Sequence, residues 1–294
     1  MMDFGTVNKP AVPKESLILE NPSMSDQEFA RLSGLFYGHT GITLPHTKKN
    51  MLTSRLMKRV KILGLRSFGE YYDYIVGDGR DSEFLNAVDM VSTNKTEFFR
   101  EPVHFTYLRE SALPDLAALR AGHGKKKIEI WSAGCSSGEE IYTLAMVLAE
   151  FSCNSYSLQF TITGTDISQR MLEKAQRGVY NRSEIQGIPP DLLRKYFLRG
   201  TRSQSGYYRV VPELRNKVDI HHLNLMEDAW SMQPDIIFCR NVMIYFDHET
   251  RNRLINKFYS RLLKDGYLFI GHSETLHGME TDFKLLIPTI YRKC

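Results

Sequence analysis

The chain has 294 residues, of which 42% are hydrophobic and 24% are charged. These values are typical of a soluble globular protein, and the length allows a sizeable core and favours two domains. A net charge of +4 is compatible with a nucleic-acid or acidic protein partner, and equally with an ordinary solvated surface.

The four cysteines are widely spaced, with no CxxC motif and no histidine at metal-ligand spacing: Cys135, Cys153, Cys239 and Cys294. This spacing argues against a zinc site and a disulfide framework, so we expect no bound metal and a reducing compartment. No apolar run approaches the roughly 20 residues that a membrane span needs, and no secretory signal is visible. We therefore expect a cytoplasmic protein without membrane insertion.

The first part of the chain predicts helices only. Residues 1–24 contain three prolines and no apolar periodicity, which predicts a flexible arm. Ser25 and Glu28 form the sequence pattern of a capping box in front of apolar residues at helical spacing. A second helix is expected from about His46 to Leu63, followed by shorter helices at 68–76 and 83–91. We predict an N-terminal helical domain over 25–95, then a linker with a connecting helix over 96–127.

From residue 128 the pattern changes to alternating strands and helices, and we assign 128–294 to a second domain. Strands are expected at 128–131, 160–165, 217–223, 235–239 and 267–271, helices at 139–150, 168–177 and 249–263, and an antiparallel pair within 282–293. Such alternation predicts a mostly parallel, doubly wound sheet with helices on both faces. About 40 residues, 178–216, exceed what a crossover needs, and they contain a hairpin pattern around the polar loop 201–205. We predict an inserted β-subdomain there.

A turn of small residues at 133–138 follows the first strand, and Glu139 and Glu140 open the next helix. The turn matches neither the phosphate-binding loop nor the GxGxxG motif. Two acids at a helix N-terminus would repel a pyrophosphate but suit a cationic group such as a sulfonium. This favours S-adenosylmethionine over NAD, although acids in a first helical turn also serve as simple caps.

The ends of the next strands carry further polar residues. Asp166 can accept hydrogen bonds from the two hydroxyls of a ribose, or it can merely cap the helix that begins near Ser168. Arg240 and Asn241 follow a later strand, at the carboxyl edge where ligands of open α/β sheets bind. The combination indicates an enzyme that binds an adenosine-bearing cofactor.

Several blocks of the chain resemble the chemotaxis receptor methyltransferases of the CheR type: STNKTEFFRE (92–101), WSAGCSSGEEIYT (131–143), GTDIS (164–168), FCRNVMIYF (238–246) and GHSE (271–274). The resemblance spans about 25–292. It implies a class I S-adenosylmethionine methyltransferase fold, with a seven-stranded sheet and an inserted β-subdomain, behind a small all-α domain. It also implies S-adenosylmethionine-dependent O-methylation of glutamate side chains on chemoreceptor cytoplasmic domains, with S-adenosylhomocysteine as product.

The resemblance also implies roles for individual residues. The cofactor would be bound by Asn94, Thr96, Arg100, Glu139, Asp166, Asn224, Leu225, Arg240 and Asn241. A glutamate carboxylate is already ionised near pH 7 and needs no general base, because its reference pKa is about 4.3. We expect Arg240 or Arg100 to orient this carboxylate and the Tyr245 hydroxyl to help hold the acceptor or the methyl donor, which makes these three residues the catalytic candidates.

A partner surface is expected on the second helix, where basic residues share one side: Lys48, Arg55, Lys58 and Arg59. Without the resemblance this would be an ordinary solvated face; with it, we expect contact with the acidic receptor helices. The inserted hairpin offers a strand edge for a receptor C-terminal peptide. A nucleic-acid methyltransferase and a non-catalytic receptor-binding or cofactor-sensing protein remain alternatives, although Arg240-Asn241-Val242-Met243 is not the Asn/Asp-Pro-Pro-aromatic motif typical of base-amino methylation.

Overall fold

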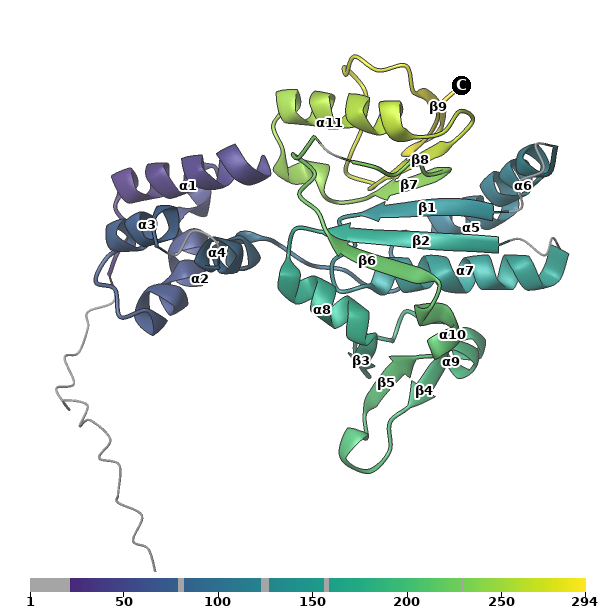
Figure 1. Cartoon of the computed structure of the whole chain (residues 1–294), viewed down its shortest axis with the longest axis horizontal. Coiled ribbons are helices and arrows are strands. Elements are labelled where there is room, and N and C mark those ends of the chain that lie inside the picture. Colours follow the sequence, from purple (N-terminus) through teal and green to yellow (C-terminus); the bar gives the residue numbers. More distant parts are fainter. Residues whose placement is uncertain (1–21, 79–81, 123–126, 156–158, 229) are drawn as a thin grey trace, which may run out of the picture.

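The structure, a computed structural model, describes residues 22–78, 82–122, 127–155, 159–228 and 230–294. Residues 1–21 of the predicted arm and residues 123–126 of the predicted linker lie outside the described residues. Figure 1 shows a group of N-terminal helices beside a large sheet, with a smaller sheet below it.

The N-terminal part is helical, as predicted, and has its own core. It consists of α1 (Asp26–Thr40), a 3-10 turn η1 (His46–Lys48), α2 (Lys49–Ile62), α3 (Phe68–Val76) and α4 (Glu83–Val91). The capping box at the start of α1 is confirmed: the Glu28 N–H donates to Ser25 Oγ, and the Ser25 N–H donates to Glu28 Oε2 at 2.8 Å. One apolar side of each helix is buried in a shared cluster that includes Phe36, Leu52, Leu56, Phe68, Tyr71 and Val88.

A helical segment connects this part to the large sheet. It runs through α5 (Pro102–Tyr107), a π-helical turn η2 (Leu108–Ala112) and α6 (Leu113–Gly122). Its apolar side chains, among them Phe105, Leu108 and Leu116, belong to the core on one face of the sheet. The segment therefore covers that face rather than acting as an open linker.

The large sheet has seven strands in the order β6-β2-β1-β7-β8-β10-β9, which confirms the predicted mostly parallel sheet. Its parallel strands are β1 (Lys127–Ala133), β2 (Gln159–Asp166), β6 (Val218–His222), β7 (Ile236–Cys239) and β8 (Tyr267–Ile270). The antiparallel pair is β9 (Lys284–Ile287) with β10 (Ile290–Arg292), the latter next to β8.

Helices cover both faces of this sheet. Neighbouring residues Ile130 and Trp131 of β1 point to two different cores, as the alternation of side chains along a strand requires. The first core includes residues of α7 (Glu139–Ser155) and α8 (Gln169–Arg177), and the second includes residues of α11 (His248–Arg261). The carboxyl ends of β1 and β2 face the N-terminal helices in Figure 1, so the loops at this edge lie between the two parts.

The predicted inserted β-subdomain is a three-stranded antiparallel sheet in the order β3-β5-β4. The predicted hairpin is β4 (Phe197–Arg199) with β5 (Tyr207–Val210), joined by a loop that contains η3 (Arg202–Gln204). The strand β3 (Val179–Asn181) and the short helices α9 (Pro190–Tyr196) and α10 (Pro212–Arg215) were not predicted.

The end of α1 contacts the large sheet's loops directly. Ile42 forms a β-bridge with Phe246, and the Thr43 N–H donates to the Tyr245 carbonyl at 2.8 Å. The Tyr37 hydroxyl donates to Asp247 Oδ2 at 2.6 Å. These contacts fix the helical part against the loop after β7, which includes η4 (Met243–Tyr245). Among the described helices, none has the length and apolar character that crossing a membrane would require.

Candidate functional site

A pocket lies where the carboxyl edge of the sheet meets the helical part. Its volume is about 180 Å³, and apolar side chains such as Ile42, Ile167 and Val242 form part of its wall. The loops after β1, β2, β6 and β7 contribute to it, together with the stretch 91–96 and residues 40–44 after α1. The predicted site residues that line it are Lys48, Asn94, Thr96, Arg100, Asp166, Asn224, Leu225, Arg240, Asn241 and Tyr245.

The turn of small residues after β1 lets the backbone form one wall of this pocket. Gly134 has a φ of +86°, and a Cβ there would come within 2.4 Å of Val242 Cγ2. Ser136 follows, also with a positive φ, and its N–H donates to Asp166 Oδ2 at 2.8 Å. The turn is therefore shaped by left-handed backbone and by a carboxylate from the neighbouring strand.

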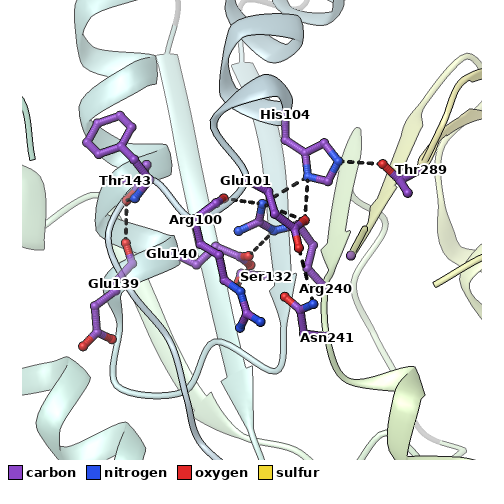
Figure 2. A network of polar contacts seen from close by, with 12 residues as sticks. Arg100, Glu101, His104, Ser132, Glu139, Glu140, Thr143, Arg240, Asn241 and Thr289 are labelled. Carbon is purple, nitrogen blue, oxygen red and sulfur yellow. Dashed lines mark hydrogen bonds and ion pairs between the residues drawn. The ribbon is translucent and has the colours of Figure 1, made fainter. Parts of the chain in front are cut away.

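Glu140 is the acid of the pair that faces the pocket. Its Oε1 accepts a hydrogen bond from Ser132 Oγ at 2.7 Å, and its Oε2 accepts one from Arg240 Nε, also at 2.7 Å (Figure 2). Both partners fix the carboxylate without removing its negative charge. The site therefore presents an oriented anion to its ligand.

Glu139 lies elsewhere. Its carboxylate accepts hydrogen bonds from Ser137 Oγ and stands 3.9 Å from Lys174 Nζ, and it lines a separate hollow near Ser183 and Glu184. Burial raises the pKa of its carboxyl group. Glu139 does not line the first pocket, whereas the adjacent Glu140 does, but it shares the second hollow with the predicted residues Asn94 and Thr96.

Asp166 lines the pocket, and it does not cap α8 itself. Its carboxylate accepts hydrogen bonds from the Ser136 N–H and from the Ser168 N–H, at 2.8 and 2.9 Å. Ser168 itself is the N-cap of α8, through a hydrogen bond from the Met171 N–H to Ser168 Oγ. Burial raises the pKa of Asp166, but the backbone donors favour its ionised form. Each carboxylate oxygen retains acceptor capacity for a ligand hydroxyl.

The two pocket arginines differ in their partners. Arg240 is almost fully buried and donates to Glu140, to the Arg100 carbonyl and to His104 Nδ1. Arg100 is half-buried, and its guanidinium donates to the Lys95 carbonyl at 2.9 Å. Within the described residues no carboxylate pairs with Arg100. Arg100 can therefore bind a carboxylate of a ligand, and the exposed Lys48 and Lys95 are further cations in the pocket wall.

Further predicted residues also belong to the wall. Asn224 is tied to the helical part, because its amide donates to the His39 carbonyl, and its Oδ1 accepts from the Met226 N–H. Asn241 has a φ of +60°, held by a hydrogen bond from its N–H to Glu274 Oε2. The Tyr245 side chain is half-buried, and no hydrogen bond reaches its hydroxyl within the described ranges.

The basic residues of α2 do not act as one exposed face. Arg55 donates to the carbonyls of residues 90–92 at the end of α4, and Arg59 forms an ion pair with the buried Glu83. Lys58 is exposed, and Lys48 is exposed at the pocket. Of the four predicted receptor-binding residues, only these two make no such side-chain contact with another residue that the structure describes.

Sequence reasoning missed several wall residues, most of them apolar: Thr40, Ile42, Leu44, Ile167, Leu223 and Val242. Ordinary apolar residues carry no chemical signature, so no sequence signal marks them. Together with Glu140, Arg100 and Asp166 they fit S-adenosylmethionine. The Glu140 carboxylate suits the cationic groups of this cofactor, and the Arg100 guanidinium suits its carboxylate. Asp166 suits the ribose hydroxyls, and the apolar residues suit the adenine ring.

Comparison with known proteins agrees with this arrangement. The family "CheR methyltransferase, SAM binding domain" matches residues 94–291, and "CheR methyltransferase, all-alpha domain" matches residues 27–92. A chemotaxis protein methyltransferase of Borreliella burgdorferi is 40% identical over 93% of this chain and 96% of its own length. That of Escherichia coli is 38% identical over 92% of each chain. The chain therefore belongs to the CheR methyltransferase family, with an all-α domain and an S-adenosylmethionine-binding methyltransferase domain.

Proposed function

We propose that this chain methylates glutamate side chains on the cytoplasmic helices of chemoreceptors, giving glutamyl methyl esters for chemotactic adaptation, and that it works in the cytoplasm. The carrying observation is the composition of the pocket: a fixed carboxylate at Glu140, an arginine, Arg100, that pairs with no carboxylate of the described residues, and a hydroxyl at Tyr245. Relatives named chemotaxis protein methyltransferase support the choice of substrate.

The residues around the pocket would hold S-adenosylmethionine, which supplies an activated methyl group when bound. Glu140 would face its cationic methionine part and Arg100 its carboxylate. Asp166 would accept from the ribose hydroxyls, and Asn224 and Leu225 would flank the adenine. Asn94 and Thr96 would complete the side formed by the stretch before α5. Glu139, which is held by Ser137 and lines the adjoining hollow with Asn94 and Thr96, would act from that side.

The protein's task toward the acceptor is orientation. An acceptor glutamate is ionised near pH 7, so the site needs no general base, and among the described pocket residues none has to serve as one. Holding the reacting groups in line can contribute about 7–11 kcal/mol to the barrier reduction. The Nε and Nη1 groups of Arg240 are held by protein groups, so we assign this residue to shaping the site and assign the positioning of the acceptor to Tyr245.

Docking of the receptor would use exposed positive charge. Of the four predicted receptor-binding residues, Lys48 and Lys58 are exposed, and Lys48 also lines the pocket. Contacts between these lysines and acidic receptor helices would place a receptor glutamate at the opening of the pocket. A receptor C-terminal peptide would add to the small sheet at β4, an edge strand whose Leu198 side chain is exposed.

Labelled S-adenosylmethionine tests the proposal. The purified chain is incubated with chemoreceptor cytoplasmic fragments, with fragments whose acceptor glutamates are alanine, and with nucleic acid. Base-labile label on the intact fragments alone is the expected result. Stable label, label on nucleic acid, or cofactor binding without transfer to any fragment would contradict it.

A further inference from the structure

His104 lies behind the pocket, buried between Arg240 and Thr289. Its ring is 1% exposed and comes from α5, outside the pocket wall. Its Nδ1 is 3.0 Å from Arg240 Nη1, and its Nε2 is 2.7 Å from Thr289 Oγ1 (Figure 2). The imidazole therefore bridges the loop after β7 and the turn between β9 and β10.

The partners fix the direction of every hydrogen bond in this chain of contacts. A guanidinium can only donate, so Nδ1 must accept from Arg240, and Nε2 then carries the proton and donates to Thr289. The Thr289 hydroxyl in turn donates to the Pro288 carbonyl at 2.5 Å. Burial and then the charge of Arg240 lower the pKa of His104 to about 4, which keeps the ring neutral.

Arg240 stands between two carboxylates. Its Nε donates to Glu140 at 2.7 Å, whereas Glu101 Oε2 lies 3.5 Å from Nη1 and has no hydrogen-bond partner within the described part of the chain. Glu101 Oε2 also lies 3.5 Å from His104 Nδ1. The ring centroids of His104 and His272 are 5.1 Å apart. These are the charged and titratable groups facing His104: Glu101 from its own segment, Arg240 from the loop after β7, and His272 after β8.

We propose that neutral His104 is a positioning residue, which holds Arg240 toward Glu140 and so fixes the carboxylate that faces the cofactor. Without an acceptor at Nδ1, one buried N–H of Arg240 loses its partner. The unpaired Glu101 oxygen is then the nearest replacement, and turning toward it draws the guanidinium away from Glu140. The inference rests on the proposed function, because it assumes that the cofactor occupies the pocket beside Glu140.

Two substitutions of His104 separate hydrogen bonding from packing. His104→Leu removes the acceptor, whereas His104→Asn retains an oxygen near the position of Nδ1. Calorimetry should show that the Kd for S-adenosylhomocysteine rises about tenfold in His104→Leu. In His104→Asn, at least half of the change in log Kd should be restored. Phe269→Leu, which alters a ring packed against His104, is the matched control: it should lower Tm without changing Kd.

Equal affinity of His104→Leu and the wild-type protein, with both folded, would overturn the proposal, and so would failure of His104→Asn to rescue. Absence of binding by the wild-type protein would instead reject the proposed function. A measurement on the unmodified chain covers the case in which His104→Leu does not fold. The ¹⁵N shifts of His104, assigned by comparison with His104→Asn, should show a protonated Nε2 and a bare Nδ1 from pH 5 to 8. A protonated Nδ1 at pH 7 would also overturn the proposal.

Discussion

Arg59 and Glu83 form a two-point ion pair that joins α2 to α4, with donor–acceptor distances of 2.8 and 2.5 Å. The Glu83 side chain is 4% exposed, and the Tyr71 hydroxyl also donates to it. Removing one member of such a buried pair leaves an uncompensated charge. The contact is therefore structural, and it takes Arg59 out of the surface available to a receptor.

Charge reversal on α2 should separate stability from docking. Arg59→Glu should lower the free energy of unfolding by about 3 kcal/mol, because it leaves Glu83 buried beside a second carboxylate. Lys58→Glu, one residue earlier and exposed, should leave stability within about 0.5 kcal/mol and raise the KM for receptor fragments. Urea denaturation and methylation kinetics measure the two effects. An unchanged receptor KM in Lys58→Glu would remove this residue from the docking surface.

The two acids at the start of α7 should respond differently to neutralisation. Glu140→Gln should weaken S-adenosylhomocysteine binding by about tenfold, because it removes the charge that Arg240 orients. Glu139→Gln should stay within about twofold of the wild-type Kd, since this carboxyl group is outside the pocket. Calorimetry on both proteins gives the comparison. The opposite ranking would place the functional acid at Glu139.

Arg100 should be needed for binding but not for folding. Its guanidinium donates to the Lys95 carbonyl, and no described carboxylate pairs with it, so Arg100→Met should change Tm little. Loss of a charge-assisted contact to the ligand carboxylate should raise Kd by at least tenfold. Arg100→Lys, which keeps the charge without the planar fork, should be intermediate. Wild-type affinity in Arg100→Met would exclude the contact.

Removing the Tyr245 hydroxyl should affect transfer rather than cofactor binding. Tyr245→Phe keeps the packed ring, so the Kd for S-adenosylhomocysteine should remain within about twofold. The rate of methyl transfer to receptor fragments should fall by about tenfold or more, as expected when a positioning contact made in the transition state is lost. Undiminished transfer with normal cofactor affinity would refute the role of this hydroxyl.

His104 should make stability depend on pH in a predictable direction. An unfolded histidine binds a proton near pH 6.5, but folded His104 does so only near pH 4. Between these values the unfolded state binds more protons, so stability falls as the pH is lowered. The full shift corresponds to about 3 kcal/mol at most. Urea unfolding of the wild-type protein and of His104→Asn, at pH 7 and pH 4.5, isolates this contribution; an identical pH response in both would contradict the prediction.

Much of the fold could be predicted because its signals are local. Ser25 and Glu28 specified the start of α1, and the ranges expected for α3 and α4 match the observed Phe68–Val76 and Glu83–Val91. Strand β3, with three residues, and the π-helical turn before α6 lack such signals. Their conformations depend on tertiary packing, which overrides weak local preference.

The site was predictable by residue type but not by orientation. Helical spacing grouped Arg55 and Arg59 with Lys58, yet the carbonyls of α4 and the Glu83 carboxylate that engage the two arginines are about 24 to 37 residues away in sequence. Likewise, the pair Glu139-Glu140 indicated an acid at the turn. That Glu140 is the one held at the first pocket depends on Ser132 and Arg240, which only the folded sheet brings together.

The bridge between Ile42 and Phe246 has a consequence for any attempt to divide the molecule. A fragment that starts at Asn94 would retain Glu140, Asp166 and Arg100 but would lose the side of the chamber formed by residues 40–44. Solvent would then enter the pocket from that side. The N-terminal part thus contributes directly to the wall of the pocket. A partner that bound these helices would therefore contact the element that also lines the pocket.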